Sequence, residues 1–320
     1  MSGLCDIWQR LKGSVRTLIY THGHPDADTL GSALALKRAL KNSGGQAYVT
    51  CIDPIPSRLA FLCDEELPAG FLPTLVCAVD VASYRMLGVK DDSLRGAIDI
   101  KIDHHRTGDD YAGVNYTDAG AAACGEIIYT MLSQNAPELI DAGVAEALYA
   151  AIASDTGCFR FSNTTADTHR IAASLMGFGI DVGALNHRLF ESRSQGEVAA
   201  LKKALDSLEF HCGGRLALIC FTNEDKEKYG FDDDNISAHA SLTREIEGVE
   251  LGITLRQKSN DPTAWKASMR SGERVDASAL CGIFGGGGHI RAAGCEIRAE
   301  GAAEACEIIL REAKKVFENE

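Results

Sequence analysis

The sequence predicts an α/β protein in which a larger N-terminal domain, with a doubly wound and mainly parallel sheet, precedes a smaller α/β domain. Three observations lead to this prediction. Apolar runs of strand length alternate with helix-like stretches over roughly the first 185 residues, and such alternation favours a parallel sheet. Beyond Gly213-Gly214 the pattern changes to strands separated by turns. A length of 320 residues fits two domains.

The elements of the first domain follow from the period of its apolar residues. We expect strands at 17–20, 47–52, 75–79 and 97–102, helices at 30–40, 119–131 and 142–153, and a loop at 162–167 that leads into one more helix. The first of these helices should close at Gly44-Gly45, because glycine commonly ends helices.

The second domain is expected to begin after a charged, helix-prone stretch. Its predicted strands lie at 216–221, 249–256, 265–270 and 295–298, and its predicted helices at 277–283 and 302–317. The resulting boundaries are 1–187 for the first domain, 188–212 for a linker helix and 213–320 for the second domain.

Composition narrows the class of protein. With 45% apolar and 24% charged residues the chain has the composition of an ordinary globular enzyme, without an apolar run long enough for a membrane helix and without a signal peptide. Its 11 cysteines include no C-x-x-C pair, which indicates thiols in a reducing, cytoplasmic compartment and disfavours structural zinc. A net charge of −13 disfavours a protein that grips long duplex nucleic acid and favours a short anionic substrate.

Two compact clusters of histidine and aspartate follow predicted strands. The segment 22–28 reads H-G-H-P-D-A-D after the first strand, and 103–105 reads D-H-H after the fourth. Asp80 and Asp155 also follow apolar runs. Because ligands of open α/β sheets bind at the carboxyl ends of the strands, segments far apart in sequence can meet there. Carboxylates and imidazoles without thiolates suit divalent cations, so we expect a metal site.

Each of these signals has a simpler explanation, which stays open at this point. An isolated D-x-D before a helix is often only a helix cap, and Asp155 before Thr156-Gly157 could close a helix. His105 could serve only as a structural hydrogen-bonding group. In the second domain Arg270 ends the predicted strand 265–270, and it could simply be a surface residue that pairs with Glu273. His24 is expected to be a loop residue near the metals and not a ligand.

A further signal lies in the second domain, where the chain reads G-G-G-G-H at 285–289 and A-A-G at 292–294. Without Cβ atoms in the way, backbone amides of such a stretch can approach an anion closely. A flexible loop is the alternative.

Taken together, H-x-x-P-D-A-D-x-x-G-S from His22, D-H-H, D-T-G and G-G-G-G-H-x-x-A-A-G resemble the DHH phosphoesterase family. Within it, the chain is similar to the two-domain members of the nano-RNase and pAp phosphatase type, which carry a DHH-associated C-terminal domain. The order of the motifs covers nearly the whole chain. His24 and Ala27 stand where the family most often has Asn and Gly, and neither change removes a ligand.

The resemblance assigns roles to residues by position. One metal would be held by His22, Asp26 and Asp80, and a second by Asp28, Asp80, His104 and Asp155, with Asp80 bridging. Asp103 would orient His104 through its second ring nitrogen, and His105 would contact the scissile phosphate. In the C-terminal domain Arg270, Gly287, Gly288 and His289 match the substrate-binding residues. The resemblance favours two Mn²⁺ ions, with Mg²⁺, Co²⁺, Fe²⁺ or Zn²⁺ as alternatives.

The implied activity is hydrolysis of short oligoribonucleotides, pApA or pAp to mononucleotides by a metal-bridging hydroxide, with His105 and Arg270 neutralising charge on the phosphoryl oxygens. Cyclic-di-AMP phosphodiesterase activity is the alternative, and a nucleotide-binding module without catalysis is a third interpretation. The substrate is expected in the cleft between the two domains. Long nucleic acid and membranes are not expected partners, and the resemblance suggests a homodimer.

Overall fold

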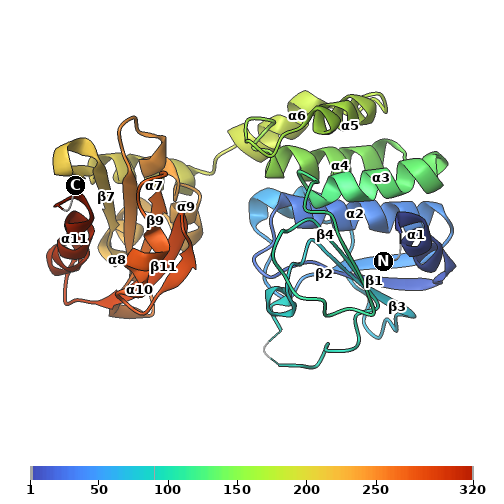
Figure 1. Ribbon diagram of the computed structural model, residues 1–320, viewed down its shortest axis with the longest axis horizontal. Helices are drawn as coiled ribbons and strands as arrows, with labels where there is room; N and C mark the ends of the chain where they lie inside the picture. Colours follow the sequence, from blue (N-terminus) through green and yellow to red (C-terminus); the bar gives the residue numbers. More distant parts are fainter. Residues whose placement is uncertain (1–2, 90, 319–320) are drawn as a thin grey trace. The chain divides into compact units, whose positions relative to one another are not determined.

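The computed structural model describes residues 3–89 and 91–318, which belong to two compact units, Met1–Ser192 and Arg193–Glu320 (Figure 1). The first unit contains α1 Leu4–Gly13, β1 Arg16–Tyr20, α2 Ala27–Asn42, β2 Gln46–Thr50, the 3₁₀ helix η1 Ser57–Leu62, β3 Leu75–Val79, η2 Tyr84–Leu87, β4 Ile100–Asp103, β5 Val114–Thr117, α3 Cys124–Asn135, η3 Pro137–Leu139, α4 Ala142–Asp155, α5 Ala166–Met176, α6 Val182–Asn186 and a π-helical turn η4 His187–Glu191.

The sheet of this unit is parallel throughout, which confirms the predicted fold class. Its strand order is β2-β1-β3-β4-β5, one of the orders of doubly wound sheets. The helices α1 to α4 lie on one face (Figure 1), and their core includes Ile19, Leu36, Ile102 and Leu148. A smaller cluster around Tyr84 and Leu87 packs at the other face, so η2 and its flanking segments take the place of α-helices there.

Several elements of this unit differ from the sequence-based expectation. Helix α1 was not predicted, although Ile7, Trp8 and Leu11 form a buried stripe of helical spacing that holds it against the core. Strand β5 was missed because it is a short edge strand whose residues are at most half-buried, so no apolar run marks it. The helix expected from residue 119 begins only at Cys124, after a series of turns.

The second unit is built on a mixed sheet of order β10-β11-β9-β8-β7-β6, in which β7 and β8 are the parallel pair. Its elements are α7 Gln195–Asp206, β6 Glu209–His211, η5 Cys212–Gly214, β7 Leu216–Phe221, α8 Asn223–Tyr229, α9 Asp233–Ser237, η6 Leu242–Glu245, β8 Leu251–Lys258, β9 Asp261–Ser271, α10 Ala277–Gly282, β10 Gly287–His289, β11 Ala292–Arg298 and α11 Ala302–Glu318. The unit boundary falls within 188–212, where a linker helix is predicted.

The two faces of this sheet are covered unequally. On one face every second residue of the central strands is apolar, as at Ile253 on β8, and these side chains pack against α10 and α11 in a core that includes Trp265, Met269 and Ile309. On the other face α7 and α9 cover β7 through Ala200 and other small or apolar residues.

No helix in the described ranges 3–89 and 91–318 is both long and apolar enough to cross a membrane.

Candidate active site

The six predicted metal ligands gather at the carboxyl edge of the parallel sheet. His22, Asp80 and His104 directly follow or closely follow β1, β3 and β4. Asp26 caps helix α2, with its Oδ1 accepting the backbone N–H groups of residues 28 and 29, and Asp28 lies in the first turn of that helix. Asp155 is the last residue of α4. The capping role and a place in the cluster therefore coexist in Asp26.

The side-chain ligand atoms form three overlapping groups, and within each group they lie within 4.8 Å of one another. The groups are His22, Asp26 and Asp80; Asp28, His104 and Asp155; and Asp80, His104 and His105. Asp80 belongs to two of them, which is the placement that a bridging carboxylate requires.

The two imidazoles are turned the way metal-binding histidines usually are. His22 has Nδ1 2.7 Å from the carbonyl oxygen of Gly23 and Nε2 3.6 Å from Asp80 Oδ2. His104 has Nδ1 3.3 Å from the carbonyl oxygen of Ala121 and Nε2 3.3 Å from Asp155 Oδ2. When Nδ1–H donates to a carbonyl group, the lone pair of Nε2 points at the carboxylates and is available to a cation.

Two carboxylates of the cluster are buried at an energetic cost. Burial and the charges of neighbouring aspartates hold the pKa of Asp28 and the pKa of Asp80 well above the usual range. Asp80 Oδ1 is buried and has no hydrogen-bond partner. Because buried like charges repel and an unpaired carboxylate oxygen is unfavourable, this site is suited to divalent cations, which would neutralise it.

The backbone conformation at Asp80 is also unusual. Its φ of 60° lies in the left-handed region, which few residues other than Gly, Asn and Asp adopt readily. The Asp80 N–H still donates to the carbonyl oxygen of Ile102, at 2.9 Å, and so continues the pairing of β3 with β4. This turn bends the chain sharply at the strand end, where the carboxylate joins the cluster.

The beginning of α3 holds Asp28, a contact that sequence reasoning missed. Asp28 Oδ2 accepts the N–H of Cys124 at 2.7 Å and Oδ1 accepts the N–H of Gly125 at 3.1 Å. Amide donors at a helix N-terminus stabilise an anion. A Cβ at Gly125 would lie 2.8 Å from the Cβ of Ala151, so glycine permits α3 to approach α4 here. In the sequence, the small residues that precede α3 were the feature that could have predicted this contact.

Asp103 contacts a different histidine from the predicted one. Its Oδ1 lies 2.7 Å from His105 Nδ1, whereas His104 turns Nδ1 to a backbone carbonyl group. The predicted pairing of Asp103 with His104 is therefore wrong, because His104 turns its ring away into the carboxylate cluster. The hydrogen bond to Asp103 raises the pKa of His105. A second missed residue is Lys101, a buried cation whose Nζ lies 3.8 Å from Asp103 Oδ2.

Burial disfavours the thiolate form of Cys124, a thiol next to the cluster. Burial and the nearby charge of Asp28 raise the pKa of Cys124 well above its usual range, and its Sγ lies 3.5 Å from the carbonyl oxygen of Ile102. The donor set is therefore made of carboxylates and imidazoles, as predicted from sequence. Such a set suits Mn²⁺, Mg²⁺ and related ions.

The predicted substrate-binding residues form a second group, in the C-terminal unit. Arg270 on β9 is paired with Ala292 on β11, which is paired with His289 on β10. Residues directly opposite in antiparallel strands present their side chains on the same face of the sheet, so Arg270 and His289 share a face. The glycine-rich stretch is thus in part an edge strand, with residues 287 and 288 paired to β11. Glu273 lies 3.5 Å from Arg291, so the alternative partner of Arg270 is engaged elsewhere.

Glycine is required at Gly288, where φ is 146°. A Cβ there would lie 2.6 Å from the carbonyl oxygen of Ala292 and 2.7 Å from the Cα of Ala293. No L side chain fits that approach without a shift of the backbone. The close pairing of β10 with β11 therefore depends on this residue.

Comparison with protein families gives two matches. Residues 16–152 match the N-terminal domain of the DHH family, and residues 213–319 match the DHHA1 domain. A protein of Thermus thermophilus named bifunctional oligoribonuclease and PAP phosphatase NrnA is 33% identical over 300 residues, which are 91% of this chain and 87% of that protein. The protein of the same name from Bacillus subtilis is 25% identical over 88% of each chain. A cyclic-di-AMP phosphodiesterase, PdeA of Listeria monocytogenes, is 24% identical, with the match covering 91% of this chain and 46% of that protein.

Solved structures share the fold. The crystal structure of an exopolyphosphatase-related protein from Bacteroides fragilis superposes with a TM-score of 0.84 at 19% identity, over 99% of this chain and 96% of that chain. The exonuclease RecJ bound to manganese gives a TM-score of 0.54 at 13% identity, over 100% of this chain and 94% of that chain. At these identities the likeness concerns the fold alone.

Proposed function

Because this chain belongs to the DHH phosphoesterase family and joins a DHH domain to a DHHA1 domain, we propose that it hydrolyses short oligoribonucleotides, pApA and pAp to mononucleotides. The observation that carries the proposal is the gathering of six side chains whose ligand atoms lie in overlapping groups, two of which include Asp80: His22, Asp26, Asp28, Asp80, His104 and Asp155. The 33% identity to a named oligoribonuclease and PAP phosphatase over most of both chains supports the choice of substrate.

The residues of the cluster fit two divalent ions, which we propose to be Mn²⁺. The first ion would be held by His22, Asp26 and Asp80, and the second by Asp28, Asp80, His104 and Asp155. When bound, such ions supply an activated water and neutralise charge on the reacting phosphate. The chain itself prepares the site, because α3 fixes the Asp28 carboxylate and two backbone carbonyl groups fix the imidazoles.

His105 is the residue we assign to the scissile phosphate. Its Nδ1 is engaged by Asp103, and its side chain is 37% exposed, so Nε2 is the ring atom available to substrate. The raised pKa of His105, caused first by the hydrogen bond to Asp103, favours the protonated ring. A protonated imidazole donates to a phosphoryl oxygen and stabilises the charge that develops there. We propose Asp103 as the residue that positions His105.

Arg270, Gly287, Gly288 and His289 are proposed to bind the nucleotide. Arg270 and His289 share a face of the C-terminal sheet, and a guanidinium group and an imidazole are suited to a nucleotide phosphate. A cytoplasmic location is part of the same proposal.

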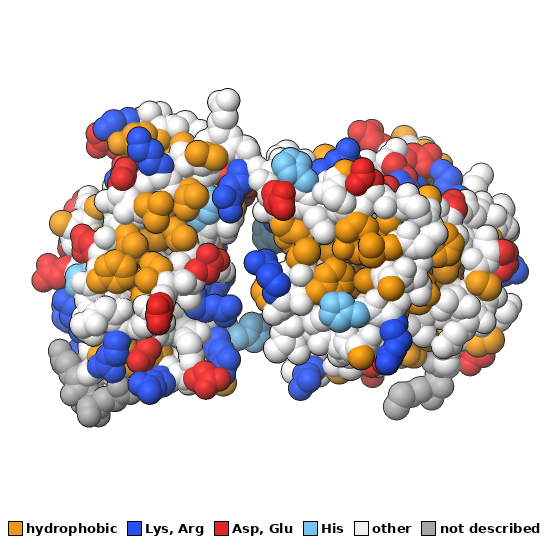
Figure 2. Space-filling view, turned by 90° about the horizontal axis from the view of Figure 1, so that it is seen from above, with side chains coloured by type: hydrophobic (Ala, Val, Ile, Leu, Met, Phe, Trp, Pro, Cys, Tyr) orange, Lys and Arg blue, Asp and Glu red, His pale blue; other side chains and the backbone are white. Residues whose placement is uncertain are grey.

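A homodimer also belongs to the proposal. Figure 2 shows hydrophobic side chains gathered into a patch on the visible face of each unit. Exposed apolar patches are frequent sites of subunit association. Light scattering after size-exclusion chromatography would show a mass near twice that of the chain, 34.2 kDa, and a monomer would overturn this part.

The function is tested by turnover in the presence of Mn²⁺ on pAp, pApA, a pentanucleotide RNA and cyclic-di-AMP, each assayed separately, with an Asp103→Ala/His104→Ala double variant as control. Release of AMP from the first three substrates alone would support the proposal. Faster opening of cyclic-di-AMP would replace it with turnover of that second messenger. No turnover of any of the four would favour a nucleotide-binding module without catalysis.

A further inference from the structure

A groove on the C-terminal sheet is lined by more cationic than acidic side chains. It encloses about 630 Å³ and is lined by residues of β8, β9 and β11 together with Asp233 at the start of α9. Three of its side chains are cations, Arg256, Lys258 and Lys266, and two are acids, Asp233 and Glu296. Its floor at residue 294 is a glycine without a side chain, so the sheet backbone itself is accessible there.

Both acids of the groove are already shared. Glu296 lies 2.9 Å from Lys258 and 3.6 Å from Arg298. Asp233 lies 2.8 Å from Lys226 and 3.9 Å from Arg256. The groove and its margin therefore hold an excess of cations, in a protein whose overall formal charge is −13.

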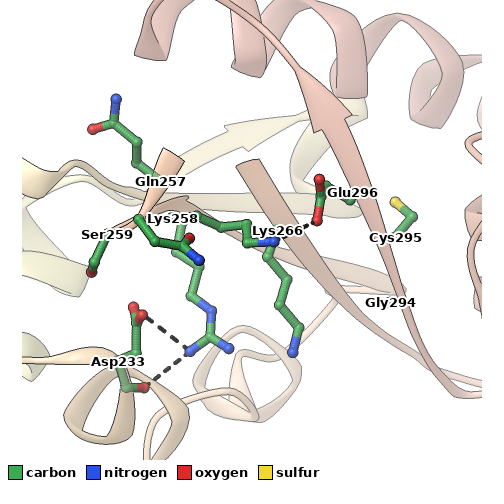
Figure 3. Close-up of a pocket in the computed structure, with 10 residues that line it drawn as sticks. Asp233, Gln257, Lys258, Ser259, Lys266, Gly294, Cys295 and Glu296 are labelled. Carbon is green, nitrogen blue, oxygen red and sulfur yellow. Dashed lines mark hydrogen bonds and ion pairs between the residues drawn. The ribbon is translucent and has the colours of Figure 1, made fainter. Parts of the chain in front are cut away.

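Lys266 is the cation left without a partner. Among residues 3–89 and 91–318, no carboxylate forms an ion pair with it, and Figure 3 shows its ammonium group ending away from Glu296, which Lys258 contacts. Strand register places Lys266 opposite Arg256 and Glu296. Burial lowers the pKa of the Lys266 amine, the positive charges of Arg256 and Lys258 lower it further, and the charge of Asp233 offsets only part of this shift. An anion bound beside Lys266 and Arg256 would relieve this repulsion.

The groove lies on the same sheet face as the proposed nucleotide-binding residues. Lys266 and Arg270 are four residues apart on β9, so they share a face and lie about 13 Å apart at about 3.3 Å per residue. Ser268 and Gly294, which are paired in register, lie between them and offer only small groups. A distance of this size spans more than one nucleotide of an extended single strand, whose backbone commonly follows such a basic track.

We propose that Lys266 and Arg256 form a distal phosphate subsite, which binds the backbone of an oligoribonucleotide at least one nucleotide beyond the unit held by Arg270 and His289. This subsite rests on the proposed function and narrows it. The affinity of the protein for RNA then increases with RNA length, because pAp and a dinucleotide are too short to reach Lys266. It also explains how an acidic protein holds an anionic strand, since the basic track is local.

The subsite is tested by binding without turnover. Fluorescence anisotropy in EDTA compares labelled diadenylate with labelled pentaadenylate, for wild type and for Lys266→Ala. We expect wild type to bind the pentanucleotide more tightly, and Lys266→Ala to lose about five- to tenfold of that affinity with no change for the dinucleotide. The slope of log Kd against log salt for the pentanucleotide should fall by about 0.7.

Lys314→Ala provides the matched control, because it removes one positive charge from α11, which packs on the opposite face of the sheet. Lys266→Arg should keep the affinity for the pentanucleotide. Equal losses for both RNA lengths, or an unchanged pentanucleotide affinity, would overturn the subsite. Failure of the proposed function would look different, since wild type would then turn over neither pAp nor pApA in Mn²⁺, whatever the result with Lys266.

Discussion

The two units of the molecule hold charge in opposite ways. In the N-terminal unit, acids are buried together, and Asp28 and Asp80 carry raised pKa values because burial and like charges disfavour ionisation. In the C-terminal unit, cations line a groove on the part of a sheet face that α7 and α9 do not cover. The acidic cluster depends on backbone groups that fix each of its side chains. The cationic groove depends only on which strands lie side by side.

This contrast predicts where substitutions should have severe effects on function and where the effects should be graded. A buried cluster fails as a whole when one shared group is removed, because the remaining charges lose the ion that they surround. An exposed cationic face loses one contact at a time, so its losses are graded.

Asp80→Asn should abolish turnover, because it removes the one carboxylate that belongs to two ligand groups. We expect kcat to fall about 10³-fold or more and bound metal to be lost, as measured with pApA and by elemental analysis. Asn tolerates the left-handed backbone at this position, so the variant should stay folded by circular dichroism. Asp167→Asn, at an exposed site on α5, is the control. Substantial turnover with metal retained would contradict the bridging role.

Asp103→Asn should lower kcat about 10²-fold and leave metal content unchanged, because Asp103 contacts His105 and not His104, the proposed metal ligand. The carboxylate raises the pKa of His105, so its loss should move the basic limb of the pH profile of kcat/KM to lower pH. Parallel loss of metal would show that Asp103 supports the ligand cluster itself, and the distinction between His104 and His105 would then fail.

Arg270→Ala should raise KM for pApA about tenfold and change kcat and metal content much less, because a single charged contact to phosphate is lost. Arg270→Lys should restore part of the affinity. Loss of metal in Arg270→Ala would contradict this contrast, since metal binding in the N-terminal unit would then depend on a residue of the C-terminal unit. Elemental analysis of the same preparation distinguishes the two results.

Stability of the metal-free protein should rise as the pH falls from neutrality. Asp28 and Asp80 have pKa values raised by burial, so protonating them favours the folded state, and this contribution is lost as the pH rises through those raised values. Burial alone would lower the pKa of His22, but Asp26, the carbonyl group of Gly23 and Asp155 together outweigh it, so this pKa is also raised and acts in the same direction. We expect a shift of a few degrees in Tm by calorimetry in EDTA. Mn²⁺ should remove the trend by stabilising the protein at neutral pH, and a metal-free Tm that rises with pH would contradict the assignment.

The gathering of these side chains could be predicted because it depends on local patterns. His22, Asp80 and His104 each come at or just after a run of apolar residues, and the carboxyl ends of parallel strands share one edge. The partner of Asp103 could not be predicted, because two adjacent histidines follow the strand and only their ring orientations decide which one meets it.

The basic groove could not be predicted from the sequence, for another reason. The alternation of β9 shows that Lys266 and Arg270 share a face, but it does not show whether helices cover that face. That depends on where α7, α9, α10 and α11 pack, which is a property of the whole unit. Helix α1, by contrast, carried a recognisable stripe at Ile7, Trp8 and Leu11, which a count of apolar spacing would have found.

The left-handed backbone at Asp80 has an evolutionary consequence. An aspartate codon becomes an asparagine codon by a single nucleotide change, and asparagine is among the few residues that this conformation accepts. A gene can therefore lose the chemistry of its product without losing the product, whose C-terminal unit would keep its basic face. Among homologues, Asn at this position would mark proteins that have turned from cleaving nucleotides to retaining them.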